Sequence, residues 1–128
     1  MSTTMLYVTF DCYDPVKLAS FWATVFSYDV DARNAAFGEA EITDPTGLGL
    51  PIMFLKVPEG KTVKNRVHLD LALETPMEAE VERLVASGAR AVETHQDPEG
   101  YDGPYIWTVM QDPEGNEFCV GEPLSGRA

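Results

Sequence analysis

Cysteine and histidine are scarce in this sequence, which contains two of each among 128 residues. Cys12 and Cys119 lie in separate apolar stretches, and the chain contains no CxxC pattern. A disulfide framework and a cysteine-rich zinc site are therefore both excluded, because each needs several cysteines at close spacing. We expect two reduced thiols in a reducing compartment.

Positive charge is also scarce. Nine lysines and arginines stand against 21 aspartates and glutamates, which gives a formal net charge of −12. A surface of this charge repels phosphate groups, so nucleic acids and anionic membranes are excluded as partners. No stretch approaches the roughly 18 apolar residues of a membrane span, and the first residues lack the charged and apolar segments of a secretory leader. We therefore expect a cytoplasmic protein.

One pattern occurs twice along the chain. Residues 6–12 and 67–73 alternate apolar and polar side chains, which is typical of a strand with one buried face. Each segment is followed by an oxygen-bearing residue, a proline and apolar residues at helical spacing, which predicts a helix. Thr75 with Glu78 predicts a capping box for the second helix, and Gly88 predicts its end.

Each predicted helix is followed by three short strands. They are expected at residues 27–30, 39–43 and 52–57 in the first half, and at 89–93, 105–110 and 117–120 in the second. We therefore expect an α+β fold in which residues 1–128 form one domain of two tandem βαβββ units. The units span about 5–57 and about 65–122, and a polar segment, 58–64, that contains Pro and Gly links them.

Two such units, together with the Asp-Pro-Glu-Gly-Asn-Glu-Phe segment at 112–118, resemble the vicinal oxygen chelate superfamily. The resemblance is to its small glyoxalase-like and bleomycin-resistance-like members, and it extends to Phe21-Trp22 on the first helix and to residues 64–70. It implies that each unit curls its strands into a half-barrel, with the helix outside and a cavity between the units. We also expect a homodimer, because the resemblance implies one and because the exposed edge strands of two half-barrels need a partner to cover them.

The alternation along the first strand of each unit assigns two faces. The apolar faces, expected to pack on the helices, carry Leu6, Val8 and Phe10, and Val67, Leu69, Leu71 and Leu73. The polar faces, expected to face the cavity, carry Tyr7, Thr9 and Asp11, and His68, Asp70 and Ala72. Phe21, Trp22 and Phe26 have the spacing of a buried helical stripe and are expected in the core.

Metal-using members of the superfamily hold an ion with four His, Gln or Glu ligands. The corresponding positions here are Tyr7, a residue near Met53, His68 and Cys119, of which only His68 is a usual ligand. Zinc needs at least three donors, and no third donor is predicted beside His68 and Cys119, the one pair that would suit a soft metal. We therefore expect no cofactor and no glyoxalase I activity, with a divalent metal held by His68 and Cys119 as the alternative.

The resemblance implies that a small organic molecule binds in the cavity. For an enzyme, we expect a lyase or isomerase acting next to a carbonyl, in which His68 is the general acid or base, Asp70 orients it and Tyr7 donates to a developing oxyanion. The residues expected to contact the substrate are Thr9, Asp11, Met53, Tyr105, Trp107, Glu117 and Cys119.

Other interpretations stay open. His68 is also compatible with a structural role. Asp11 and Asp70 are compatible with ion pairs to Arg66 or Lys64. Cys119 is compatible with the role of a small buried apolar residue. The main alternative function is non-catalytic sequestration of a drug or metabolite, for which the negative net charge favours a cationic ligand. A third interpretation is a structural or regulatory subunit whose cavity is filled by its own side chains. Residues 94–103 are interpreted as a lid or a plain connector.

Overall fold

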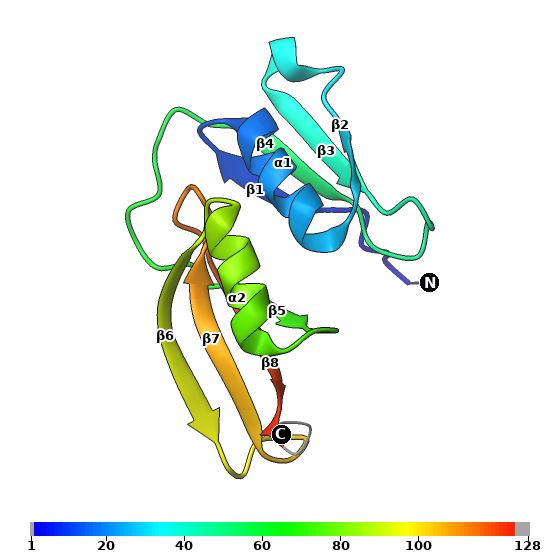
Figure 1. Ribbon diagram of the computed structural model, residues 1–128. Helices are drawn as coiled ribbons and strands as arrows, with labels where there is room; N and C mark the ends of the chain where they lie inside the picture. Colours follow the sequence, from blue (N-terminus) through cyan, green and yellow to red (C-terminus); the bar gives the residue numbers. More distant parts are fainter. Residues whose placement is uncertain (1, 125–128) are drawn as a thin grey trace. The chain divides into compact units, whose positions relative to one another are not determined.

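The computed structural model describes residues 2–124, which form two units (Figure 1). One unit ends at Lys61 and the other begins at Thr62, within the segment predicted to link them. Each unit contains a strand, a helix and three further strands, in that order. The predicted α+β fold of two tandem βαβββ units is confirmed.

The first unit is a four-stranded sheet with one helix. Its elements are β1 (Val8–Cys12), α1 (Pro15–Phe26), β2 (Asp29–Asp31), the short 3-10 helix η1 (Ala35–Phe37), β3 (Glu39–Thr43) and β4 (Ile52–Lys56). The strand order is β1-β4-β3-β2, and β1 runs parallel to β4 while the other pairs are antiparallel. The first and last strands of the unit are therefore neighbours.

Helix α1 begins where the Asp14-Pro15 pair predicts. The Asp14 side chain accepts a hydrogen bond from the Lys17 backbone N–H (3.2 Å), which satisfies an otherwise unpaired donor of the first turn. Trp22 is fully buried and contacts Phe10 of β1 at a centroid distance of 5.4 Å. The helix ends at Ser27, which has the left-handed φ of 57° that glycine usually supplies.

The second unit repeats this topology. Its elements are β5 (Leu69–Ala72), α2 (Met77–Ala86), β6 (Arg90–Asp97), β7 (Tyr105–Gln111) and β8 (Glu117–Pro123), and the strand order is β5-β8-β7-β6. Helix α2 lies over one face of the sheet (Figure 1). On β7, Ile106, Thr108 and Met110 are buried, and the Thr108 hydroxyl contacts the Met77 sulfur of α2 at 3.5 Å. The alternate residues of β7 therefore lie on the other face.

Both first strands are shorter than the alternation predicts. Leu6 is 72% exposed and Val67 is 83% exposed, so the prediction that they pack on the helices is wrong. Next to β1, Pro51 precedes the partner strand and has no N–H with which to extend the ladder. Next to β5, Asn116 uses its backbone N–H and C=O in bonds to Asp112 of the preceding turn.

The predicted capping box at α2 is also wrong. The Thr75 hydroxyl donates to Glu80 (3.2 Å) rather than bonding the helix backbone, and the helix begins after Pro76. The Met77 N–H instead donates to the side chain of Glu122 on β8 (3.4 Å). A long-range partner has replaced the local cap, which sequence spacing alone does not reveal.

Strand β6 is longer than predicted and shortens the expected lid. Residues 94–97 continue the strand and pair with β7, so the connection begins only at residue 98. Within the described residues, neither helix is long and apolar enough to cross a membrane.

Candidate functional site

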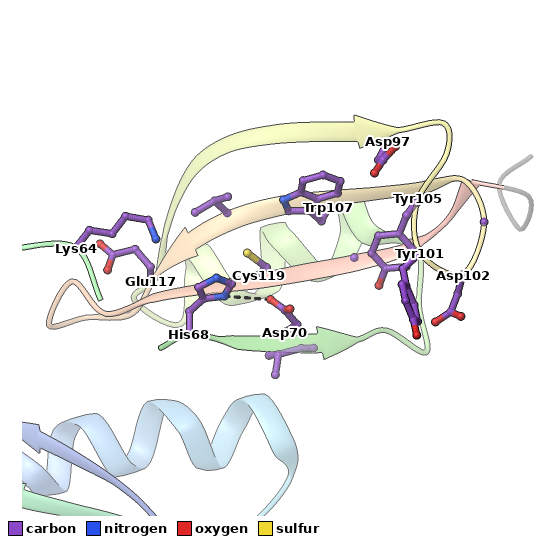
Figure 2. A pocket seen from close by; sticks show the side chains of 15 residues that line it. Lys64, His68, Asp70, Asp97, Tyr101, Asp102, Tyr105, Trp107, Glu117 and Cys119 are labelled. Carbon is purple, nitrogen blue, oxygen red and sulfur yellow. Dashed lines mark hydrogen bonds and ion pairs between the residues drawn. The ribbon is translucent and has the colours of Figure 1, made fainter. Parts of the chain in front are cut away.

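The second unit contains a pocket of about 670 Å³ on the face of its sheet opposite α2 (Figure 2). Strands β5, β8 and β7 supply most of its wall, and residues 100–103 of the connection between β6 and β7 complete it. All the residues that line this pocket belong to the second unit.

Strand register brings the side chains of the pocket together. Asp70 of β5 lies opposite Cys119 of β8, and Cys119 in turn lies opposite Val109 of β7. Because residues directly opposite in a sheet point to the same face, these three side chains share one wall. The same rule places Trp107 beside Gly121.

Gly121 makes room for the aromatic side chains of β7. A Cβ atom at this position would lie 2.8 Å from the Ile106 carbonyl oxygen and 2.9 Å from the Trp107 Cβ. The Trp107 ring is supported by His95, whose ring stacks on it at a centroid distance of 5.3 Å. His95 is itself fixed by a 2.9 Å hydrogen bond to Glu93. Trp107 is therefore a positioned wall of the pocket.

His68, Asp70 and Cys119 form a polar cluster at the centre of this wall (Figure 2). His68 Nδ1 lies 3.1 Å from Asp70 Oδ1, and because a carboxylate only accepts, Nδ1 is the donor. The Nε2 atom of neutral His68 then carries the free lone pair. Asp70 is 75% exposed at its side chain, so this pair contributes little to stability and serves mainly to orient the imidazole.

The thiol of Cys119 is held in its protonated form. Burial raises its pKa most, and the negative charge of Asp70 and a hydrogen bond to that carboxylate raise it further, against a smaller opposing effect of Lys64. Burial, followed by the charges of Asp70 and Glu122, likewise raises the pKa of Tyr105. At neutral pH both groups are therefore hydrogen-bond donors rather than anions.

Glu117 is anchored at one end of the pocket. Its carboxylate accepts from the Asn65 backbone N–H (2.8 Å) and from the Gln111 side chain (3.3 Å). Lys64 lies beside it (Figure 2). These contacts fix the segment that leads into β5.

The structure brings six of the predicted site residues into this one pocket: His68, Asp70, Tyr105, Trp107, Glu117 and Cys119. The others, Tyr7, Thr9, Asp11 and Met53, belong to the first unit. Thr9 and Met53 are cross-strand partners there, and Met53 lines a small hollow of about 210 Å³. Tyr7 precedes β1 and is 39% exposed, so its predicted place within the strand is wrong.

Several pocket residues were not predicted. They are Lys64, Asp97, Tyr101, Asp102 and Gly121, together with His95, whose ring stacks on that of Trp107. Continuing the strand alternation from residue 93 to residue 97 would have placed Glu93, His95 and Asp97 on one face. Tyr101 and Asp102 lie in a connection, where alternation carries no information.

The cluster also bears on metal binding. The ligand atoms of His68, Asp70 and Cys119 all lie within 4.8 Å of one another, so Asp70 supplies the third donor that was not predicted. Three protein donors are the minimum for zinc, and a thiol among them favours softer metals over Mn²⁺. The residues therefore suit a zinc-like ion, and they differ from the His, Gln and Glu ligands that the resemblance to the superfamily implies.

Comparison with known families identifies the class. Residues 7–121 match the model of the glyoxalase-like domain, so the chain belongs to that family, within the vicinal oxygen chelate superfamily. No curated protein matches the chain.

Solved structures show the same fold at low sequence identity. A glyoxalase/bleomycin resistance protein/dioxygenase family enzyme from Burkholderia phytofirmans has a TM-score of 0.70 and 20% identity, over 93% of this chain and 98% of that one. A mutant of the fosfomycin resistance protein FosX from Listeria monocytogenes, in complex with Mn(II) and 1S,2S-dihydroxypropylphosphonic acid, has a TM-score of 0.72 and 16% identity. That match covers 96% of this chain and 92% of FosX.

Proposed function

We propose that this protein binds a small organic molecule in the pocket of its second unit. The observation that carries the proposal is the pocket itself, whose volume of about 670 Å³ is within the usual range for small-molecule sites. It combines a supported aromatic wall, Trp107, with the polar cluster of His68, Asp70 and Cys119. Such a combination gives both apolar contact area and orienting polar groups.

A ligand screen on the whole chain tests this proposal. Metabolites and drugs that raise the Tm are titrated against the wild type and against Trp107→Ala and Trp107→Phe. We expect at least tenfold weaker binding in Trp107→Ala and a smaller loss in Trp107→Phe, because the second variant keeps an aromatic face. Phe37→Ala is the control, since Phe37 is an exposed aromatic residue of the first unit. Ligands whose affinity does not depend on Trp107 would contradict the proposal.

The His68–Asp70 pair favours a second function, proton transfer next to a carbonyl group. With Nδ1 donating to Asp70, Nε2 is the group that would remove a proton from a carbon atom beside a carbonyl. In an isomerase, His68 would return that proton to a neighbouring atom. In a lyase, the electron pair left on the carbon atom would expel a leaving group from the adjacent atom, and His68 would give the proton to that group. The neutral thiol of Cys119 is a donor rather than a nucleophile in this scheme.

A metal ion held here would supply a Lewis acid that polarises the carbonyl group in place of the base, because a ring nitrogen of His68 that binds a metal has no lone pair left to accept a proton. His68, Asp70 and Cys119 are the residues that would hold it. Orientation of the substrate against Trp107 does not depend on this ion.

Exchange of ligand protons in D₂O separates enzyme from binding protein. For a ligand found in the screen, we expect wild type to exchange the protons beside its carbonyl group, as followed by NMR. His68→Gln should abolish exchange and leave affinity within about threefold. Binding without any exchange in the wild type would favour the alternative, sequestration of the bleomycin-resistance kind. The predicted homodimer is checked separately by light scattering.

A further inference from the structure

The two ends of the pocket differ in charge (Figure 2). Lys64 and Glu117 lie at one end, whereas Asp97, Tyr101 and Asp102 lie at the other. Lys64 is the only lysine or arginine among the described residues that line the pocket. The end that contains Asp97 and Asp102, called here the acidic end, therefore has no basic lining residue of its own.

Distance keeps the two ends electrostatically separate. Asp97 lies opposite Tyr105, and Glu117 lies opposite Gln111. Tyr105 and Gln111 are the first and last residues of β7, so the ends are about 20 Å apart at roughly 3.3 Å per residue. Charges of exposed groups are screened over about 8 Å at physiological ionic strength. The ammonium group of Lys64 therefore does not neutralise the acidic end.

Aromatic residues share this end of the pocket with the two carboxylates. Tyr105 is the cross-strand partner of Asp97, and its ring lies 6.5 Å from that of Trp107, with an angle of 32° between the planes. Tyr101 adds a third ring beside Asp102 (Figure 2). Aromatic faces attract cations, and the attraction adds to that of nearby carboxylates. A flat ring with a positive charge would therefore use both kinds of group at once.

The acidic end does not have the composition of a metal site. Within residues 2–124, the one group of three or more His, Cys, Asp or Glu side chains close enough to hold a metal is His68, Asp70 and Cys119. Asp97 and Asp102 belong to no such group. An organic cation, which needs no inner ring of ligands, suits two separate carboxylates and an aromatic wall better than an inorganic ion does.

We propose that the ligand of this pocket carries a positive charge on or beside a flat aromatic ring, and that this ring binds between Trp107, Tyr105 and the carboxylates of Asp97 and Asp102. The inference rests on the proposed binding function and adds to it the chemical class of the ligand.

Three probes of similar shape and different charge test the inference. N-Methylquinolinium is a cation, quinoline is uncharged at pH 8, and quinoline-2-carboxylate is an anion. Each is titrated by calorimetry into the full chain in 50 mM and 500 mM NaCl. We expect the cation to bind about 3- to 10-fold more tightly than quinoline at low salt. The preference should fall towards unity at high salt, because the carboxylates are accessible to counterions.

Paired variants locate the source of the preference. Asp97→Asn combined with Asp102→Asn should remove the preference for the cation, so that N-methylquinolinium and quinoline bind this variant with equal affinity. Glu74→Gln combined with Glu82→Gln removes the same charge from exposed positions that do not line the pocket, and should keep the preference.

The outcomes separate this inference from the proposed function. If quinoline or quinoline-2-carboxylate binds as tightly as the cation or more tightly, the proposed ligand class is wrong. If that binding is lost in Trp107→Ala, the proposal that the pocket binds small molecules is still supported. Persistence of the preference in the Asp97 and Asp102 double variant would also overturn the ligand class. If none of the three probes binds at concentrations up to about 5 mM, the inference is wrong, and the pocket does not bind flat aromatic rings.

Discussion

Asp70 and Cys119 lie directly opposite each other in the parallel pair of β5 and β8. The carboxylate accepts from His68 on its own side and from the thiol across the pair. One exposed acid therefore acts on two neighbouring groups: it orients the imidazole of His68 and helps to raise the pKa of the Cys119 thiol.

Removal of this charge should make Cys119 more reactive. In Asp70→Asn the pKa of the thiol should fall, since a negative charge and a hydrogen-bond acceptor that both raise it have been removed. We expect alkylation of Cys119 by iodoacetamide at pH 7.5 to become about 3- to 10-fold faster, measured by mass spectrometry in a Cys12→Ser background. Glu82→Gln is the control for net charge. An unchanged or slower reaction would show that Asp70 does not govern the thiol.

Metal preference should follow the donor set of the cluster. Zn²⁺ should raise the Tm more than Mn²⁺ at the same concentration, because Cys119 offers sulfur and His68 offers nitrogen. Cys119→Ser should narrow the difference between the two ions without removing it, because the nitrogen and oxygen donors of His68 and Asp70 still favour Zn²⁺ over Mn²⁺. A larger effect of Mn²⁺ on the wild type would contradict this prediction and indicate oxygen ligands from elsewhere.

Ser27→Gly should stabilise the first unit. Ser27 has a φ of 57° at the end of α1, a conformation that costs residues with a Cβ atom about 1–2 kcal/mol. After subtracting the entropy that glycine loses on folding, we expect the free energy of unfolding to rise by about 0.5–1 kcal/mol in urea titrations. Ser27→Ala keeps the Cβ atom and should give no gain. Equal effects of the two substitutions would refute the explanation by φ.

Asp44 should make stability depend on acid pH. Hydrogen bonds from the Thr46 hydroxyl and backbone N–H (2.8 Å each), and from the Gly49 N–H (2.7 Å), hold its pKa below the usual value of about 3.9. A carboxylate with a lowered folded-state pKa stabilises the fold fully above the unfolded value and loses this effect as pH falls through the folded value.

The matched variant for this test is Asp44→Asn, which cannot titrate. We expect the stability difference between wild type and Asp44→Asn to be constant from pH 7 to about pH 5 and to shrink below about pH 4. Urea titrations across this range provide the measurement. Parallel pH profiles for the two proteins would mean that the carboxylate is not linked to folding.

Local pattern was sufficient to predict most of the fold. Alternation predicts β3 and β7 closely, and the Asp14-Pro15 pair predicts the beginning of α1, because these signals depend on neighbouring residues. The capping of α2 depends on Glu122, which is 45 residues away from its partner, and was predicted wrongly. The late start of β5, at Leu69 rather than at residue 67, depends on the turn at Asp112 and Asn116 in the same way.

The site was predicted in its parts but not in its assembly. Alternation places His68 and Asp70 on one face. The parallel register that puts Asp70 opposite Cys119 depends on the pairing of segments far apart in the sequence, which alternation does not reveal. The acidic end was missed because the polar run from Glu93 to Asp97 has the composition of a loop although it forms a strand. Its partner strand supplies the pairing that the composition does not suggest.

The half-buried thiol of Cys119 gives the pocket an experimental handle that requires no knowledge of the natural ligand. Cys12 is buried in the first unit, so a Cys12→Ser variant carries a single cysteine, and that cysteine faces the pocket. Fragments that carry a disulfide can exchange onto it reversibly in the presence of a mild reductant. At equilibrium, the fragments retained are those whose rings fit the wall around Trp107, because covalent attachment is equally available to all of them. Mass spectrometry of the trapped protein would then reveal the chemistry that the pocket prefers.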